Sequence, residues 1–254
     1  MNKNKEKIAV VTGATGGIGF EVAKRLGNDG FTVVLNGIED QAGADRVAEL
    51  TALGITAEYR GFDVTDENAV TSNINAIGEK YGKIDVLVNN AGGLGGRSRF
   101  EEMTTEFYRF VMALNLDSTF FASRAAIPFL KKSDYASIIN YTSNAGWNAG
   151  GPGAGIYGTS KAGVHAITRA LAKDLAEYGI RVNAVSPGTI DTPFHAQIKA
   201  TKPEVFASWK NNIMLGRLGQ PEDIAGVVSF LAGKDAAFMT AETIQIGGGQ
   251  ALGI

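Results

Sequence analysis

The residues best suited to chemistry are a tyrosine and a lysine four positions apart, Tyr157 and Lys161, with Ser143 upstream of them. Positions i and i+4 of a helix share a face, so a helix here would present the phenol and the ammonium together. A nearby ammonium favours the phenolate and lowers the pKa of a tyrosine from its ordinary value near 10. Tyr157 would then exchange a proton with a substrate oxygen, which Ser143 would also hydrogen-bond. The same spacing occurs on many half-exposed helices, so it indicates acid–base chemistry only together with other motifs.

A glycine-rich segment near the N-terminus is the second motif. It follows the apolar run Ile8–Thr12 and contains Gly13, Gly17 and Gly19. Glycines at this spacing allow a tight turn, a close backbone approach to a pyrophosphate and close packing of a helix on a strand. The N-terminus of the following helix would offer free N–H groups to the phosphates. An ordinary tight turn would use the same residues, but the position between a strand and a helix favours a dinucleotide site.

The elements that must position these motifs alternate regularly along the chain. Short apolar, β-branched runs predict strands at 8–12, 32–35, 56–61, 86–89, 137–141, 181–185 and 243–246, and helical patterns lie near 18–28, 40–53, 66–81, 105–131, 157–178 and 221–232. Thr65 and Pro221 are suitable helix starts. Nearly continuous apolar strands indicate a parallel sheet covered on both faces. We therefore predict an α/β fold, a Rossmann-like doubly wound parallel sheet of about seven strands with helices on both faces.

No linker, repeat or low-complexity segment divides the chain, which predicts one dinucleotide-binding and catalytic domain over residues 1–254. Glycine clusters at 92–96 and 146–155 each follow a predicted strand, where open parallel sheets bind ligands. The irregular segment 188–220, with Pro193, Pro203 and scattered aromatic residues, is predicted to be a lid over the same edge.

The composition excludes several classes of protein. With 44% hydrophobic and 20% charged residues and a net charge of −2, the chain is that of a globular protein with no electrostatic attraction to nucleic acid or anionic lipid. The absence of cysteine excludes disulfides, thiolate catalysis and cysteine-bound zinc, and two histidines leave no basis for a metal site. No signal peptide or membrane span is recognisable. We expect a cytoplasmic protein with a small-molecule substrate and without nucleic-acid or membrane partners.

Taken in order, the motifs resemble those of the short-chain dehydrogenase/reductase (SDR) family, in its short single-domain branch, over essentially the whole chain. The resemblance assigns catalytic roles to Asn115, Ser143, Tyr157 and Lys161. It implies NAD(P)-dependent hydride transfer between a nicotinamide and a carbonyl or alcohol, with Tyr157 as general acid or base. Lys161 would hold the nicotinamide ribose, and Asn115 would position a water that links Lys161 to solvent. The implied cofactor contacts are Gly13, Thr15, Gly16, Gly17, Ile18, Gly19, Asn36, Gly37, Asp63, Val64, Asn90, Ala91, Gly92, Tyr157, Lys161, Pro187, Gly188, Ile190 and Thr192.

The choice between NAD and NADP depends on the residues after the second predicted strand. An acidic residue there would bind the ribose of NAD and repel a 2′-phosphate. By the family pattern, Gly37 stands where NAD enzymes have the acidic residue, and Ile38 stands where NADP enzymes often have arginine. Gly16 stands where many NADP enzymes have a further basic residue. Glu39 is better explained as a favourable first-turn charge of a helix. Because no carboxylate repels a phosphate, NADP(H) is slightly favoured, with NAD(H) also used.

The predicted substrate contacts are Ser143, Trp147, Arg97 and His195, whereas His165 is interpreted as a packing residue. The loop 93–99 resembles those of family members that act on sugars, sugar acids and polyols, and Arg97 or Arg99 would bind a carboxylate. The predicted substrate is a small polar ketone, aldehyde or alcohol of the sugar, sugar-acid or keto-acid type.

Two other activities remain open. A 3-oxoacyl thioester reductase is an alternative, although Pro128 and Tyr178 stand where acyl-carrier reductases have arginines. A lyase or epimerase that uses the same Tyr/Lys pair is a second, less favoured alternative. The resemblance also implies a homotetramer that pairs the helices at 105–131 and 157–178.

Overall fold

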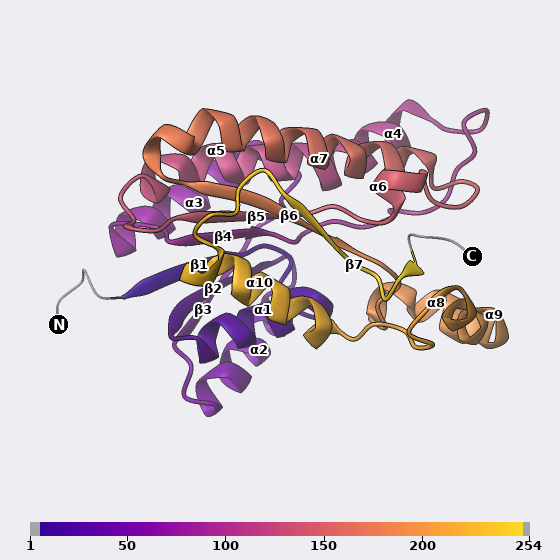
Figure 1. Cartoon of the computed structure of the whole chain (residues 1–254), viewed down its shortest axis with the longest axis horizontal. Helices are drawn as coiled ribbons and strands as arrows, with labels where there is room; N and C mark the ends of the chain where they lie inside the picture. The colour runs from indigo at the N-terminus through magenta and orange to yellow at the C-terminus, as the bar shows by residue number, and fades with distance from the viewer. Residues whose placement is uncertain (1–5, 251–254) are drawn as a thin grey trace.

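One seven-stranded sheet organises the computed structural model, which describes residues 6–250 (Figure 1). The strand order is β3-β2-β1-β4-β5-β6-β7, and every neighbouring pair is parallel. The strands are β1 (Lys7–Val11), β2 (Phe31–Gly37), β3 (Ala57–Gly61), β4 (Val86–Asn89), β5 (Ser137–Tyr141), β6 (Arg181–Pro187) and β7 (Thr243–Ile246). The predicted doubly wound α/β fold is thereby confirmed. The charged residues 1–5 and the end of the predicted domain, 251–254, lie outside the described part of the chain.

Helices cover both faces of the sheet (Figure 1). One face carries α1 (Gly17–Asn28), α2 (Asp40–Ala52) and α10 (Pro221–Ala232), and the other carries α3 (Glu67–Tyr81), α5 (Ser118–Leu130) and α7 (Gly155–Leu175). The short turns η3 (Ala176–Tyr178) and η6 (Lys234–Ala236) follow α7 and α10. Across residues 6–250, no helix combines the length and apolarity needed to cross a membrane.

The central strands are buried on both sides because their side chains alternate between two cores. Ala9 and Val11 of β1 belong to the cluster under α1 and α10, whereas Ile8 and Val10 belong to the cluster under α3 and α5. The expectation of strands covered on both faces is wrong for β3 and β7. These are the two edge strands, and their residues are mostly only half-buried.

Two predicted helix boundaries differ from the structure. The single helix expected at 105–131 is α4 (Thr105–Met112), a π-helical turn η2 (Ala113–Asp117) and then α5. The helix start expected at Thr65 lies at Asp66, whose carboxylate accepts from the N–H groups of Asn68 and Ala69. Thr65 instead donates its hydroxyl to Asp63, so it is part of the preceding turn.

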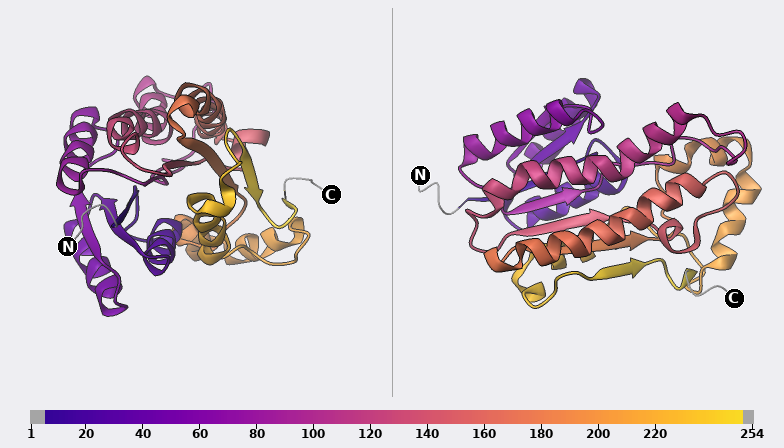
Figure 2. Two further views of the ribbon diagram at one scale, coloured as in Figure 1. Left: turned by 60° about the vertical axis from the view of Figure 1, so that its left-hand side comes forward. Right: turned by 90° about the horizontal axis from the view of Figure 1, so that it is seen from above.

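The segment predicted as an irregular lid contains several short helices. They are η4 (Pro193–His195), α8 (Ala196–Thr201), α9 (Pro203–Ser208) and η5 (Trp209–Asn212). In the right-hand view of Figure 2 this orange segment lies beyond the carboxyl ends of the strands. The short helix α6 (Ala145–Asn148), which follows β5, lies at the same end of the molecule (Figure 1). The fold therefore gathers these pieces at the edge where parallel sheets bind ligands.

Candidate active site

A cavity of about 660 Å³ opens at the carboxyl edge of the sheet. It is lined by the glycine loop after β1, the loops after β4 and β5, the first turns of α7 and the segment after β6. The described lining contains Arg97, Lys161 and His195 but no aspartate or glutamate. The cavity is therefore suited to anionic or polar, uncharged ligands.

The glycine loop forms a cradle that only glycine permits. Gly13 has φ of +62°, and a Cβ there would lie 2.9 Å from the Cα of Ala91. A Cβ on Gly19 would overlap the carbonyl oxygen of Gly13, whereas the space beside Gly16 is open. The amide of Asn90 fixes the loop by donating to the carbonyls of Thr12 and Gly13, both at 2.9 Å. This cradle precedes the N-terminus of α1 and fits the phosphates of a dinucleotide.

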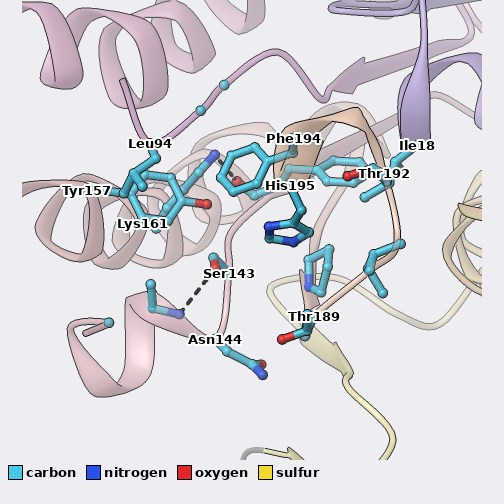
Figure 3. Close-up of a pocket in the computed structure, with 18 of the residues that line it drawn as sticks. Ile18, Leu94, Ser143, Asn144, Tyr157, Lys161, Thr189, Thr192, Phe194 and His195 are labelled. Carbon is cyan, nitrogen blue, oxygen red and sulfur yellow. Dashed lines mark hydrogen bonds between the residues drawn. The ribbon is translucent and has the colours of Figure 1, made fainter. Parts of the chain in front are cut away.

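Tyr157, Lys161 and Ser143 meet in the cavity (Figure 3). Tyr157 and Lys161 come from the first two turns of α7, and Ser143 comes from the loop after β5. The Oγ of Ser143 accepts from the N–H of Ala145 at 3.1 Å, so its own hydroxyl proton is directed to the oxygen of Tyr157. Burial raises the pKa of Tyr157 above its ordinary value, and a hydrogen bond from Ser143 partly offsets this effect. The expectation that the neighbouring ammonium lowers this pKa is therefore wrong for the free protein.

Lys161 has its own hydrogen-bond partner in the fold. Its side chain is buried, and Nζ donates to the carbonyl oxygen of Tyr141 at 2.9 Å. Nζ lies 5.9 Å from the centre of the Tyr157 ring. Burial lowers the pKa of Lys161 to about 8, and its ammonium is directed toward a backbone carbonyl.

Asn115 lies behind the cavity rather than in its lining. Its Oδ1 accepts from the N–H of Gly93 at 2.9 Å, and its Nδ2 donates to the carbonyls of Gly93 and Val111. A Cβ on Gly92 would lie 2.7 Å from this Oδ1 and 3.0 Å from Nζ of Lys161. Asn115 therefore holds the loop after β4 against Lys161. Its π-helical turn is a feature that often marks functional sites.

Most of the predicted cofactor residues line the cavity. They are Gly13, Gly16, Gly17, Ile18, Gly19, Asn90, Gly92, Tyr157, Lys161, Pro187, Gly188, Ile190 and Thr192. Six do not: Thr15, Asn36, Gly37, Asp63, Val64 and Ala91. Asn36 supports the glycine loop, because its Oδ1 accepts from the N–H of Gly13 at 3.3 Å and its Nδ2 donates to the carbonyl of Phe62 at 2.9 Å. Asp63 accepts from Thr65, and Val64 is buried.

The predicted substrate residues divide between the cavity and the surface. Arg97, Ser143 and His195 line the cavity, and Trp147 does not. The indole of Trp147 packs on His165 with centroids 4.4 Å apart and donates to Ser186, so its assignment as a substrate contact is not supported by its position. His165 is buried, as its interpretation as a packing residue requires.

Sequence reasoning missed Phe194, Trp209 and Asn212, which also line the cavity. In Figure 3 Phe194 and His195 come from the segment after Thr192. The ring of His195 lies 4.9 Å from that of Phe194 and 5.1 Å from that of Trp209. Burial and Lys199 lower the pKa of His195, although Asp191 opposes them, so the imidazole is neutral at pH 7. The aromatic residues scattered over 188–220 were the sequence feature that could have indicated these cavity-lining residues.

The cradle and the Ser143, Tyr157 and Lys161 group lie in one cavity of a doubly wound sheet. This combination defines a nicotinamide-dependent dehydrogenase or reductase that acts on C=O or CH–OH groups.

Comparison with known proteins gives the same result. A family model described as enoyl-(acyl carrier protein) reductase matches residues 13–251. The diacetyl reductase [(S)-acetoin forming] of Staphylococcus aureus is 37% identical over 252 residues, covering 96% of this chain and 97% of the relative. Actinorhodin polyketide ketoreductase with NADPH has a TM-score of 0.92 at 33% identity, covering 99% of each chain. Thermoplasma acidophilum aldohexose dehydrogenase has a TM-score of 0.87 at 31% identity, covering 98% of this chain and 95% of the other. The chain belongs to the short-chain dehydrogenase/reductase family.

Proposed function

We propose that this protein transfers a hydride between NADP(H) and a small polar carbonyl or alcohol, with Tyr157 as the general acid or base. The observation that carries the proposal is the convergence of Tyr157, Ser143 and Lys161 beside a dinucleotide cradle in one cavity. The cofactor supplies or accepts the hydride when bound. Every other step belongs to side chains of this chain.

The protonation state of Tyr157 favours its action as an acid in carbonyl reduction. Because burial raises its pKa, the phenol keeps its proton at neutral pH and can donate it to a carbonyl oxygen. The hydroxyl of Ser143 would hydrogen-bond the same oxygen when substrate is bound and stabilise the negative charge that develops there. Lys161 uses one N–H on Tyr141, which leaves two for the cofactor ribose and for stabilising the phenolate after proton transfer.

The cofactor would be held by the cradle of Gly13, Gly17 and Gly19 at its phosphates and by the segment after β6 near its nicotinamide. Asn115 would keep the loop after β4 in place against Lys161. A water linking Lys161 to solvent beside Asn115 is part of the same proposal.

The substrate end of the cavity favours a small polar molecule. Phe194, Trp209 and neutral His195 supply largely apolar walls, in which the indole N–H and the imidazole can form hydrogen bonds. The guanidinium of Arg97 donates to the carbonyl of Pro152 at 2.8 Å, which joins the loops 93–99 and 150–153. Its remaining N–H groups would bind a carboxylate or hydroxyl groups of a sugar or keto acid.

The replacement Tyr157→Phe tests the proton transfer. The phenylalanine ring fills the same space and lacks the hydroxyl, so kcat should fall at least ~100-fold while the affinity for the cofactor changes little. Nicotinamide absorbance measures kcat, and cofactor fluorescence measures the dissociation constant. Tyr178→Phe, on an exposed tyrosine, is the matched control. A Tyr157→Phe variant that keeps more than about a tenth of wild-type kcat, which is under ~1.4 kcal/mol of barrier, would exclude this role.

A substrate panel tests the substrate class. Sugars, sugar acids, keto acids, a diketone and a 3-oxoacyl thioester are compared by kcat/KM, together with the variant Arg97→Gln. If Arg97 binds a carboxylate, the variant should lose about tenfold on acids and little on uncharged substrates. Highest activity on the thioester would instead favour a 3-oxoacyl thioester reductase.

A further inference from the structure

At the carboxyl end of β2, Gly37 and Ile38 are neither acidic nor basic. The fold nevertheless brings Arg46 of α2 to the glycine loop beside this end of the strand. Nε of Arg46 donates to the carbonyl oxygen of Thr15 in the glycine loop at 3.3 Å. The same guanidinium lies 4.7 Å from the centre of the Phe20 ring on α1. Two contacts with separate elements thus hold its charge beside the cofactor loop.

Thr15 connects this arginine to the end of β2. A Cβ on Gly37 would overlap Cγ2 of Thr15 and lie 3.1 Å from its Oγ1, so the two residues are in direct contact. We call Thr15, Gly37 and Arg46 the β2 corner. In doubly wound dinucleotide-binding folds the residues after β2 meet the adenosine ribose, and a nearby arginine accommodates a 2′-phosphate.

The acidic residues around the β2 corner decide whether Arg46 is available. Glu49, one turn further along α2, pairs with Nη1 of Arg46 at 2.5 Å, and the two side chains are 44% and 38% exposed. Exposed ion pairs of this kind contribute little to stability, so a ligand can displace Glu49 readily. Asp40 points toward β3, since its Oδ1 lies where a Cβ of Gly61 would be. Glu39 is exposed at the start of α2.

We infer that Arg46 recognises the 2′-phosphate of NADP(H) and is the residue that makes this protein favour NADP(H) over NAD(H). The inference rests on the proposed function, because it requires the cradle to bind a dinucleotide. A phosphate dianion beside Thr15 offers Arg46 more negative charge than Glu49 does, and it can accept two parallel N–H bonds from the planar guanidinium. The bond to Thr15 keeps the guanidinium in place before the ligand arrives. NAD(H) lacks this phosphate and gains nothing from Arg46.

The test measures the dissociation constants of NADPH and NADH by cofactor fluorescence and calorimetry, without turnover. Arg46→Gln should weaken the binding of NADPH about tenfold or more and the binding of NADH less than about threefold. Glu49→Gln releases the guanidinium of Arg46, so this variant should bind NADPH more tightly and NADH with unchanged affinity. Arg25→Gln is the matched control, because Arg25 forms a similar ion pair with Asp29 at the far end of α1 and should change neither constant. Circular dichroism and melting temperature establish that each variant is folded.

The outcomes separate this inference from the proposed function. If the wild-type protein binds neither NADPH nor NADH, the proposed function is wrong. If it binds both and Arg46→Gln leaves the ratio of the two constants unchanged, Arg46 does not recognise the 2′-phosphate. Equal weakening of both cofactors would likewise overturn the inference, because it would show that Arg46 only supports the loop through Thr15. The inference is supported if the preference for NADPH over NADH falls in Arg46→Gln and is partly restored in Arg46→Lys.

Discussion

Replacing Lys161 with methionine should make the free protein more stable at pH 7 while removing its activity. Lys161 is 3% exposed, and burial lowers its pKa from 10.5 to about 8. Below pH 8 the folded protein therefore contains a buried ammonium whose only hydrogen-bond partner among the described residues is the carbonyl of Tyr141. Methionine has similar length and no charge to desolvate.

The magnitude follows from the two pKa values. The difference between 10.5 and about 8 corresponds to about 3 kcal/mol at 1.36 kcal/mol per pH unit. Loss of the hydrogen bond to Tyr141 costs about 1 kcal/mol, so the variant should gain about 2 kcal/mol at pH 7. Between pH 8 and 10.5 the unfolded chain keeps the lysine proton and the folded chain has released it, so the stability of the wild type rises with pH in that window. The advantage of the variant should shrink there.

Urea unfolding of the cofactor-free proteins at about pH 7 and about pH 10 measures both effects. Other groups titrate equally in the two proteins and cancel in the difference. Lys173→Met, on an exposed residue of the same helix, is the control and should show neither the gain nor the pH dependence. A Lys161→Met variant that is less stable than the wild type at pH 7, or whose difference from it is the same at both pH values, would refute the reasoning.

Four further predictions follow from the cofactor loop and the surface. Gly19→Ala should weaken NADPH binding at least about tenfold with the fold retained by circular dichroism, because its Cβ would overlap the carbonyl of Gly13; unchanged affinity would contradict the cradle. The wild type should discriminate between NADPH and NADH by less than ~100-fold in kcat/KM, and Ile38→Arg, at a 75% exposed site, should raise the preference for NADPH. Gly37→Asp should shift the preference toward NADH but also weaken both cofactors, since its Cβ displaces Thr15. Light scattering should give a particle of four chains, and a mass near 26.7 kDa at micromolar concentration would rule out the tetramer.

The sequence alone determined the fold class and the chemistry because both depend on local patterns. Nearly continuous apolar runs, such as Ile8 to Val11, predict strands buried on both faces, and that prediction holds wherever a strand has neighbours on both sides. The glycine spacing after β1 and the Tyr157/Lys161 spacing on one helix are equally local. Both motifs therefore indicated their chemistry before any packing was known.

Only the tertiary structure decided how these groups are tuned and what surrounds them. The pKa of Tyr157 is raised rather than lowered because burial outweighs the hydrogen bond from Ser143, and burial is a property of packing. The indole of Trp147 packs on His165 and does not line the cavity. Phe194 lines the cavity, although its segment has no periodic pattern of apolar residues. Arg46 reached Thr15, 31 residues earlier in the chain, through the packing of α2 beside α1. Contacts between residues distant in sequence carry no local pattern, so only the assembled fold shows them.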